Sequence, residues 1–272
     1  MIKLNGIVIK NVSVYKFLGL IIDKNLNWDE HVKSISKKIS ISIGIMHRLK
    51  HTLPNNILKL LYCSLIQSHI NYGILVWGLN PINIKKIENL QKKAIRIIDR
   101  AYFLEHTEKL FKKYKILKAS DILKHKAFST FYAIKNGFCP TSIANLVTLN
   151  TNSNKSHYRD LRSGDLVIRN YVALSNITKF SLRYYLPLLI NASDSDIITA
   201  ANMLSLPAFK NFTKCKILDK YSAAECRTPN CYACRIKRRN FNNITHAVND
   251  DISWYQQSSP FIVCTAAFEI SH

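Results

Sequence analysis

The chain has 272 residues, of which 47% are hydrophobic and 21% are charged, so its composition excludes wholesale disorder. Its 39 Lys and Arg residues outnumber its 17 Asp and Glu residues and give a formal net charge of +22. A charge of this size indicates a polyanionic partner, either nucleic acid or an anionic membrane surface. A basic protein with no such partner is the plain alternative.

Three features favour nucleic acid over a membrane. The best candidate for a membrane span, residues 70–79, is far shorter than the ~20 residues that a spanning helix needs. The N-terminus turns polar within a few residues and lacks the pattern of a signal peptide. The seven cysteines are odd in number and scattered, which is typical of reduced intracellular thiols. We therefore expect an intracellular protein, in the cytoplasm or the nucleus, that binds nucleic acid and no membrane.

Residues 1–27 are expected to form a short β hairpin or meander. Short β-branched runs at residues 7–9, 12–15 and 17–23 are separated by turn residues such as Asn11. So small a sheet is marginal unless it packs against something else. These residues are therefore interpreted as the end of a domain.

Residues 28–118 show the spacing of three helices joined by short breaks, which predicts an antiparallel bundle. Asn27 is expected to cap the first helix, and alternating isoleucines at residues 39–45 leave a strand open there. The first expected helix begins at Trp28, the second runs from Asn56 to about Val76, and the third runs from Asn83 to Arg100.

Beyond the bundle the chain is expected to remain helical. Helices are predicted at residues 107–118 and 121–136 and as a pair within 182–206, with a polar loop at 148–156. The expected fold class is therefore mostly α. A β stub at 1–27 precedes a thumb-like three-helix domain at 28–118, a helical region at 119–225 and a Cys-containing, partly disordered tail at 226–272.

Positive charge is concentrated in the three-helix segment, where residues 31–118 hold 17 Lys and Arg against four Asp and Glu. On the third expected helix a basic stripe lies opposite the apolar side, an arrangement that suits phosphate contacts. A solvated helix face is an equally plausible reading of the stripe. The candidate nucleic-acid-binding residues are Lys85, Lys92, Lys93, Arg96 and Arg100.

Four aromatic residues lie in the same segment. At helical spacing such residues are more often part of the core than stacked on unpaired bases, so burial is the favoured prediction. They are Trp28, Tyr62, Tyr72 and Trp77.

Several sequence blocks occur in order between residues 12 and 140. They are residues 17–23 (FLGLIID), 26–31 (LNWDEH), 62–73 (YCSLIQSHINYG), 76–78 (VWG), 91–98 (QKKAIRII), and the pairs at 106–107, 110–111 and 116–117. Together they resemble the C-terminal part of non-LTR (LINE-type) retrotransposon reverse transcriptases, particularly the jockey-like clade.

The resemblance implies that Phe17, Leu18 and Gly19 form a primer-grip turn at the junction of palm and thumb. Gly19 suits that role because a residue without Cβ permits a sharp turn or a close approach, although an ordinary hairpin glycine does the same. The helices that follow would be the thumb, which lies against the template–primer duplex of RNA and DNA.

The catalytic carboxylates of such polymerases are expected upstream of the FLG segment, where this chain has no room for them. Polymerisation needs clustered carboxylates that hold two metal ions. The pair Asp250-Asp251 lacks the aromatic residue of the family motif and is interpreted as a surface turn. The chain alone is therefore predicted to be inactive and to carry no cofactor, with Mg²⁺ held by the missing palm.

A possible zinc site lies near the C-terminus. Cys226, Cys231 and Cys234, followed by His246, offer a Cys3His ligand set, although their spacing departs from a compact zinc knuckle. Reduced thiols without a metal are the favoured alternative.

Four interpretations of function remain open. The first is a non-catalytic fragment of an RNA-directed DNA polymerase that binds template–primer through the thumb. The second is a polymerase that is active only when joined to a palm. The third is a free-standing basic RNA-binding protein with a zinc knuckle, and the fourth is a nonfunctional relic.

Overall fold

The computed structural model describes residues 2–4, 7–9, 12–145 and 176–221. In this part of the chain the predicted fold class is confirmed, because most residues are helical and the strands form two small antiparallel sheets. One sheet pairs β1 (Ile2–Leu4) with β2 (Ile7–Ile9), and the other pairs β3 (Val14–Phe17) with β4 (Leu20–Asp23). No described helix is both long enough and apolar enough to cross a membrane.

The β3–β4 hairpin turns through two residues. Leu18 and Gly19 connect the strands, and both have positive φ, +44° and +82°. Positive φ at both turn residues is typical of the tight hairpin turn whose twist matches the right-handed twist of the flanking strands. Glycine adopts a positive φ without strain. The prediction that Gly19 occupies a sharp turn is confirmed.

The Asp23 carboxylate organises the connection from the hairpin to α1 (Asp29–Leu49). It accepts hydrogen bonds from the amides of Asn25, Asn27 and Trp28, the last at 2.7 Å. The residue that precedes α1 is Trp28, with φ +66°, so the prediction of Asn27 as the cap is wrong. Asn27 lies one residue before the cap position, and its amide donates a hydrogen bond to the Asp23 carboxylate.

The second predicted helix is interrupted. The chain forms α2 (Asn55–Tyr62), a π-helical segment (Cys63–Gln67), α3 (Ser68–Asn71) and α4 (Ile74–Trp77). Tyr72 is extended and Gly73 has φ +61°, and these two residues break the helix. The prediction of one continuous helix to Val76 is therefore wrong beyond Asn71.

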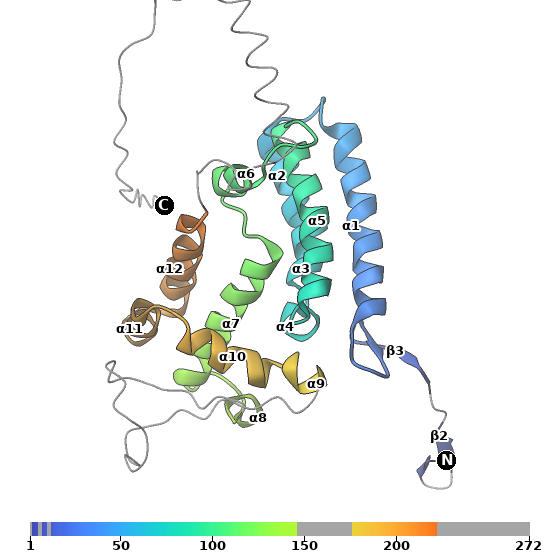
Figure 1. The fold of residues 1–272 in the computed structure, drawn as a ribbon, viewed down its shortest axis with the longest axis vertical. Helices are drawn as coiled ribbons and strands as arrows, with labels where there is room; N and C mark the ends of the chain where they lie inside the picture. The colour runs from blue at the N-terminus through green and yellow to red at the C-terminus, as the bar shows by residue number, and fades with distance from the viewer. Residues whose placement is uncertain (1, 5–6, 10–11, 146–175, 222–272) are drawn as a thin grey trace, which may run out of the picture. The chain divides into compact units, whose positions relative to one another are not determined.

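The third predicted helix is α5 (Pro81–Asp99). Asn80 caps it by accepting a hydrogen bond from the Ile82 amide at 3.0 Å, and Pro81 occupies the first turn, where its missing N–H costs nothing. Contacts pack α5 against α1 and α2, and Figure 1 shows α1 and α5 side by side. The alternative of a strand at residues 39–45 is excluded, because these residues lie inside α1.

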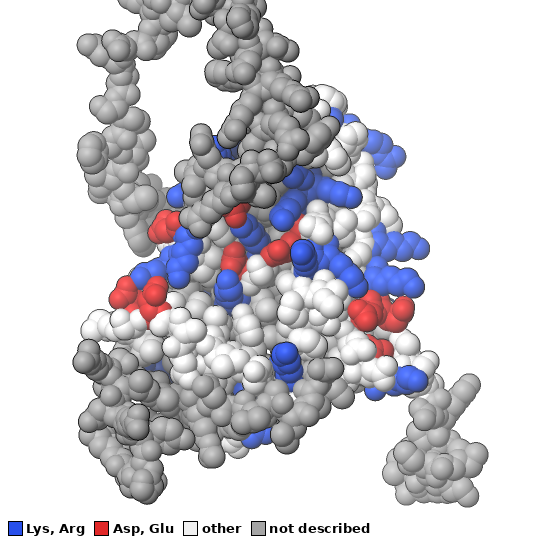
Figure 2. All heavy atoms as spheres, in the orientation of Figure 1, with Lys and Arg blue, Asp and Glu red and all other residues white. Residues whose placement is uncertain are grey.

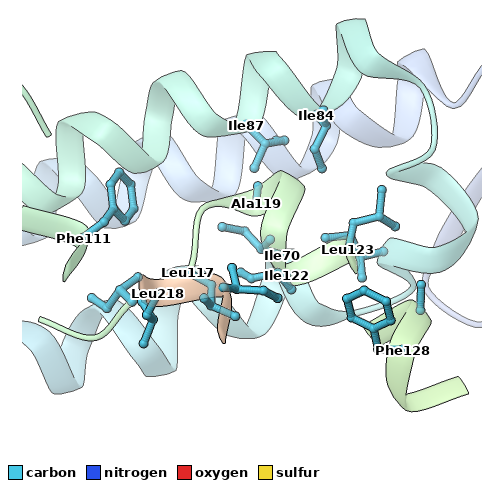
Figure 3. Packing of buried hydrophobic residues seen from close by; sticks show 14 of the residues in the cluster. Ile70, Ile84, Ile87, Phe111, Leu117, Ala119, Ile122, Leu123, Phe128 and Leu218 are labelled. Atoms are coloured by element: carbon cyan, nitrogen blue, oxygen red, sulfur yellow. The ribbon is translucent and has the colours of Figure 1, made fainter. Parts of the chain in front are cut away.

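The helices described beyond the bundle are α6 (Glu108–Lys113), α7 (Ala119–Lys135), α8 (Thr141–Ala144), α9 (Asn176–Lys179), α10 (Leu182–Asn191), α11 (Ser195–Met203) and α12 (Leu206–Asp219). Of these, α6 and α7 pack against α5, and α10 and α12 pack against α7. The predicted pair within 182–206 is confirmed, whereas α6 ends before the predicted Lys118. Figure 3 shows how Ile87 of α5, Ile122 of α7 and Leu218 of α12 approach a common core.

A buried amide links α5 to the start of α7. Gln91 is fully buried, and its Nε2 donates to the Tyr62 hydroxyl at 2.6 Å and to the Leu117 carbonyl at 2.7 Å. Its Oε1 accepts from the Ala119 amide at 2.9 Å, and Glu88 accepts from the Ser120 amide one residue later. Side chains of α5 thus satisfy two of the amides that the first turn of α7 leaves free.

Candidate nucleic-acid interface

Three of the predicted phosphate-binding residues share the outer face of α5. Lys85 and Lys93 are exposed and Lys92 is half-buried, all on the side away from the core residue Ile87. No ion pair holds these three lysines in the described part of the chain. Figure 2 shows Lys and Arg side chains over α1 and α5, whereas the surface over α10 is mostly uncharged.

The other two predicted residues hold the fold together. Arg96 Nε donates to the Glu105 carbonyl at 2.9 Å, and partial burial lowers the pKa of its guanidinium. Arg100 donates to the carbonyls of Lys50 and Leu53 at 2.8 and 3.0 Å, just beyond the end of α1. A guanidinium there satisfies carbonyls that the helix leaves free. The structure thus gives Arg96 and Arg100 contacts inside the protein.

Helix α1 adds basic residues that the sequence prediction did not include. Lys33, Lys37, Lys38 and Arg48 are exposed on α1, which runs in the same direction as α5. The direction follows from two contacts: Asn83 Nδ2 donates to the Asn27 carbonyl at one end, and Arg100 reaches Lys50 at the other. The spacing of Lys33 and Lys37, four residues apart outside the apolar face, is the signal that would have found them.

A shallow surface groove of about 550 Å³ lies between α1 and α5. It is lined by Lys33, Ser36 and Ser40 of α1 and by Lys86 and Asn89 of α5, among others. Hydroxyl and amide groups can donate hydrogen bonds to phosphate oxygens as lysines do. The groove therefore combines cationic and neutral donors, the mixture that contacts to a nucleic-acid backbone use.

The groove carries opposite charge at the N-terminal end of α1. Lys86 lies 3.7 Å from Asp29, and Lys33 lies 3.8 Å from Glu30. All four side chains are largely exposed, so these pairs contribute little to stability. They partly neutralise Lys33 and Lys86, the lysines that line the groove. The lysines of both helices that have no ion pair among the described residues include Lys37, Lys85, Lys92 and Lys93.

The predicted primer-grip turn rests on the break between α3 and α4. The Tyr72 hydroxyl donates to the Leu18 carbonyl, and the Tyr72 ring lies beside Gly19, where an added Cβ would be 3.4 Å from Cε1. An added Cβ on Gly73 would lie 2.8 Å from Leu20 Cδ2. Two blocks that carried the family resemblance, residues 17–23 and 62–73, therefore contact each other through their glycines.

Two further rings support this contact. His31 is buried and its Nδ1 accepts from the Ile21 amide at 3.3 Å, so the ring proton is on Nε2. Its ring meets Trp77 edge-on with centroids 6.1 Å apart, and Trp77 Nε1 donates to the Tyr72 carbonyl at 2.8 Å. Burial, followed by the charge of Lys38, lowers the pKa of His31.

The predicted burial of four aromatic residues is right for three of them. Tyr62 and Trp77 are fully buried, and Trp28 is half-buried against the core. Tyr72 is 53% exposed, so the prediction that it belongs to the core is wrong. Its ring covers the hairpin turn from outside. Leu18, at the turn itself, is 73% exposed.

The candidate zinc ligands Cys226, Cys231, Cys234 and His246 lie outside the described residues, as does the pair Asp250-Asp251. Within the described ranges no group of three or more His, Cys, Asp or Glu side chains is placed to hold a metal ion.

Curated proteins similar to this chain are RNA-directed DNA polymerases of mobile elements. The polymerase from mobile element jockey of Drosophila melanogaster is 29% identical over 132 residues, which is 46% of this chain and 14% of that protein. The jockey polymerase of Drosophila funebris is 27% identical over the same shares. The probable polymerase from transposon BS of Drosophila melanogaster is 28% identical over 111 residues, 39% of this chain and 12% of that protein.

These matches show that close to half of the chain is related to RNA-directed DNA polymerases. More specifically, that region is related to the polymerases of jockey-like non-LTR elements. This relationship confirms the resemblance inferred from the sequence blocks. The matched stretch spans only about a seventh of the jockey polymerase. No protein-family model and no solved structure matches the chain.

Proposed function

We propose that this chain binds nucleic acid along the groove between α1 and α5 and serves as a thumb that grips the template–primer duplex. The observation that carries the proposal is the set of lysines on the two helices that border one groove. Lys85, Lys92 and Lys93 of α5 have no acidic partner among the described residues, and Lys37 of α1 has none either.

The side chains of the groove suit contacts to the phosphate backbone of a nucleic acid and not the recognition of a base sequence. Lysines that neutralise phosphates release bound counterions, which gives affinity independent of sequence and strongly dependent on salt. Ser36, Ser40 and Asn89 add neutral donors between the lysines. In this proposal the groove sets the position of the duplex, and base pairing supplies all sequence information.

The hairpin gives the proposed interface a direction. Leu18 and Gly19 contact Tyr72, and the strand that follows them contacts His31 in the first turn of α1. The turn that resembles a primer grip is therefore tied to the end at which α1 and α5 both begin. A duplex in the groove would have its primer end at Phe17, Leu18 and Gly19.

In this proposal the chain grips nucleic acid and contributes no catalytic carboxylate. The Mg²⁺ ions of polymerisation would be bound by residues elsewhere in the polymerase, and that part is the expected protein partner. Activity would require both parts together.

Charge removal on α5 tests the proposal. In the full chain, Lys85, Lys92 and Lys93 are replaced by Gln, and binding of a labelled RNA–DNA hybrid is followed by fluorescence anisotropy. We expect at least a roughly tenfold loss of affinity at low salt and a decrease of about 2–3 in the slope of log K against log salt.

The matched control removes the same charge elsewhere. Lys126 of α7 and Lys210 and Lys214 of α12 are exposed and lie away from the groove. Their replacement by Gln is expected to change affinity by no more than about twofold. Equal losses in both triple variants, or no binding by the unmodified chain at low salt, would refute the proposal.

Zinc binding by the Cys226 segment is a separate prediction. If the Cys3His set binds zinc, elemental analysis of the purified protein gives one zinc per chain, lost on Cys231→Ser and kept on Cys215→Ser in α12; reduced thiols, the favoured alternative, give none. If the groove carries binding, the Cys231→Ser variant retains its affinity for the hybrid. A loss of that affinity would favour the free-standing zinc-organised RNA-binding protein.

A further inference from the structure

Two aromatic side chains project into solvent just beyond the C-terminal end of α5. Tyr102 is 67% exposed and Phe103 is 72% exposed, and they are neighbours in the loop that leads to α6. Large adjacent apolar groups in solvent cost free energy unless a partner covers them, so such a pair marks an interaction site.

The loop that carries the pair is fixed at its base. The Glu105 amide donates to the Tyr102 carbonyl at 3.0 Å, which closes a turn with Phe103 inside it. Arg96 holds the far side of that turn through the Glu105 carbonyl, and Arg100 holds the near side against the carbonyls that follow α1. The rings therefore project from a turn that is held on both sides, which lowers the entropy lost when a ligand stacks on them.

The surroundings of the pair are basic. Arg100 precedes it, His51 lies in the α1–α2 connection that Arg100 contacts, and Lys109 and Lys112 are exposed on the helix that follows. The neighbouring carboxylates face cations of the protein: Asp99 pairs with Lys113, Glu108 pairs with Lys118, and Glu105, in the same turn, interacts electrostatically with Arg96. An aromatic pair in a positive field favours an anionic ligand with planar rings over an apolar protein surface.

We propose that Tyr102 and Phe103 form a stacking site for unpaired nucleotides beyond the C-terminal end of α5, which is the end remote from the hairpin. This inference rests on the proposed function, because it takes the ligand in the groove to be nucleic acid. Base stacking on aromatic side chains tolerates any sequence, as the phosphate contacts of the groove do.

The length of α5 sets the size of the ligand. Lys85 and Arg100 are 15 residues apart, which is about 22 Å along a helix axis. At about 3.4 Å per stacked nucleotide, a strand that contacts both Lys85 and the aromatic pair needs roughly seven nucleotides. Lys93 lies seven residues before Arg100, about 10 Å along the axis, so a strand needs about three nucleotides to contact Lys93 and the aromatic pair together. A dinucleotide can reach only one of the two.

The test compares single-stranded and double-stranded ligands in the full chain. Tyr102→Ala with Phe103→Ala is measured by anisotropy against a labelled 12-nucleotide single-stranded RNA and a blunt 12-base-pair RNA–DNA hybrid. We expect at least a roughly tenfold loss of affinity for the single strand and a change of less than about twofold for the hybrid. The loss should be smaller for a dinucleotide, which cannot contact the lysines and the aromatic pair together.

Two further variants keep the result specific. Tyr102→Phe with Phe103→Tyr retains both rings and is expected to retain affinity for the single strand. Phe138→Ala removes an exposed ring that follows α7, and it is expected to leave the affinity for both ligands unchanged. Circular dichroism of each variant verifies that the helices are intact.

The outcomes separate this inference from the proposed function. If the unmodified chain binds neither ligand, both are overturned. If the unmodified chain binds both ligands and the double alanine variant leaves both affinities unchanged, or lowers both affinities equally, the stacking site alone is overturned. A concentration-dependent dimer that the double alanine variant abolishes, with unchanged oligonucleotide affinity, would assign the pair to a protein contact and overturn the stacking site as well.

Discussion

The hydroxyl of Tyr72 donates a hydrogen bond to the carbonyl of Leu18, and these residues lie 54 positions apart in the chain. The bond fastens a two-residue hairpin turn to the point where the second helix of the bundle is broken. An isolated two-stranded hairpin is marginally stable in water, so its position depends on such contacts. The primer-grip-like turn is thus placed by the helical bundle and not by its own strands.

Removing the hydroxyl should loosen the hairpin without unfolding the helices. Tyr72→Phe keeps the ring beside Gly19 and deletes one partly exposed hydrogen bond, so we expect a loss of about 1 kcal/mol or less in the free energy of unfolding. Amide hydrogen exchange should accelerate at Leu20 and Ile22, while the α5 amides stay protected. Tyr102→Phe, at an exposed tyrosine elsewhere, serves as the control. Unchanged exchange in the hairpin of Tyr72→Phe would show that the bond does not hold the turn.

Two glycine substitutions are expected to have opposite effects on stability. Gly73→Ala places a Cβ 2.8 Å from Leu20 in a residue with φ +61°, so it should cost at least about 1 kcal/mol. Gly44 lies inside α1 with nothing within 4 Å of an added Cβ, so Gly44→Ala should stabilise by about 0.5–1 kcal/mol. Urea unfolding of both variants measures the difference. Effects of the same sign would contradict the backbone geometry of one of the two sites.

Local spacing was enough to predict the helices but not the contacts between them. The apolar residues of α1 and α5 recur at helical spacing, and Ile39 and Ile87 are buried as that spacing predicts. The helix break at Tyr72 and Gly73 was missed because the apolar spacing continues across it to Trp77. A lone glycine in an otherwise helical pattern is tolerated often enough that it did not signal the break.

The roles of individual polar residues depended on distant partners. A count of basic residues treats Lys93 and Arg100 alike, yet Arg100 is held by carbonyls about 50 positions earlier in the chain. Gln91 reads as an ordinary helix residue, and its burial follows from partners 26–29 positions away. Such pairings follow from the packing of the helices and leave no periodic signal in the sequence.

The buried amide of Gln91 should be among the most costly polar groups to remove. Gln91→Ala leaves the Tyr62 hydroxyl, the Leu117 carbonyl and the Ala119 amide without this partner in the core. We expect a loss of about 2–4 kcal/mol in the free energy of unfolding by urea. Asn89→Ala, on the exposed side of the same helix, should stay within about 0.5 kcal/mol of the unmodified chain.

A double-mutant cycle identifies the source of that loss. Tyr62→Phe removes the phenol whose hydrogen bond Gln91 supplies, so the two substitutions together should cost less than the sum of the single ones. Strict additivity would show that Gln91 stabilises the fold through space filling alone. Burial also raises the pKa of the Tyr62 phenol, so the group stays neutral over the accessible pH range.

Acid should weaken the fold through His31. Its folded pKa is lowered by burial and by Lys38, so below the unfolded value of 6.5 the unfolded chain binds the proton more readily than the folded chain does. The stabilisation is fully present above pH 6.5 and decreases as the pH falls from there towards the folded pKa. Urea unfolding at pH 7.5 and pH 5.5 should therefore give a lower free energy at the acidic pH.

His31→Asn isolates this contribution. An asparagine oxygen can still accept the hydrogen bond of the Ile21 amide but does not titrate in this range. Burial also lowers the pKa values of His69 and His125, so the variant should retain part of the pH dependence and lose the part due to His31. If His31→Asn shows the same decrease as the unmodified chain, the folded and unfolded chains protonate His31 equally readily, and burial does not lower its pKa.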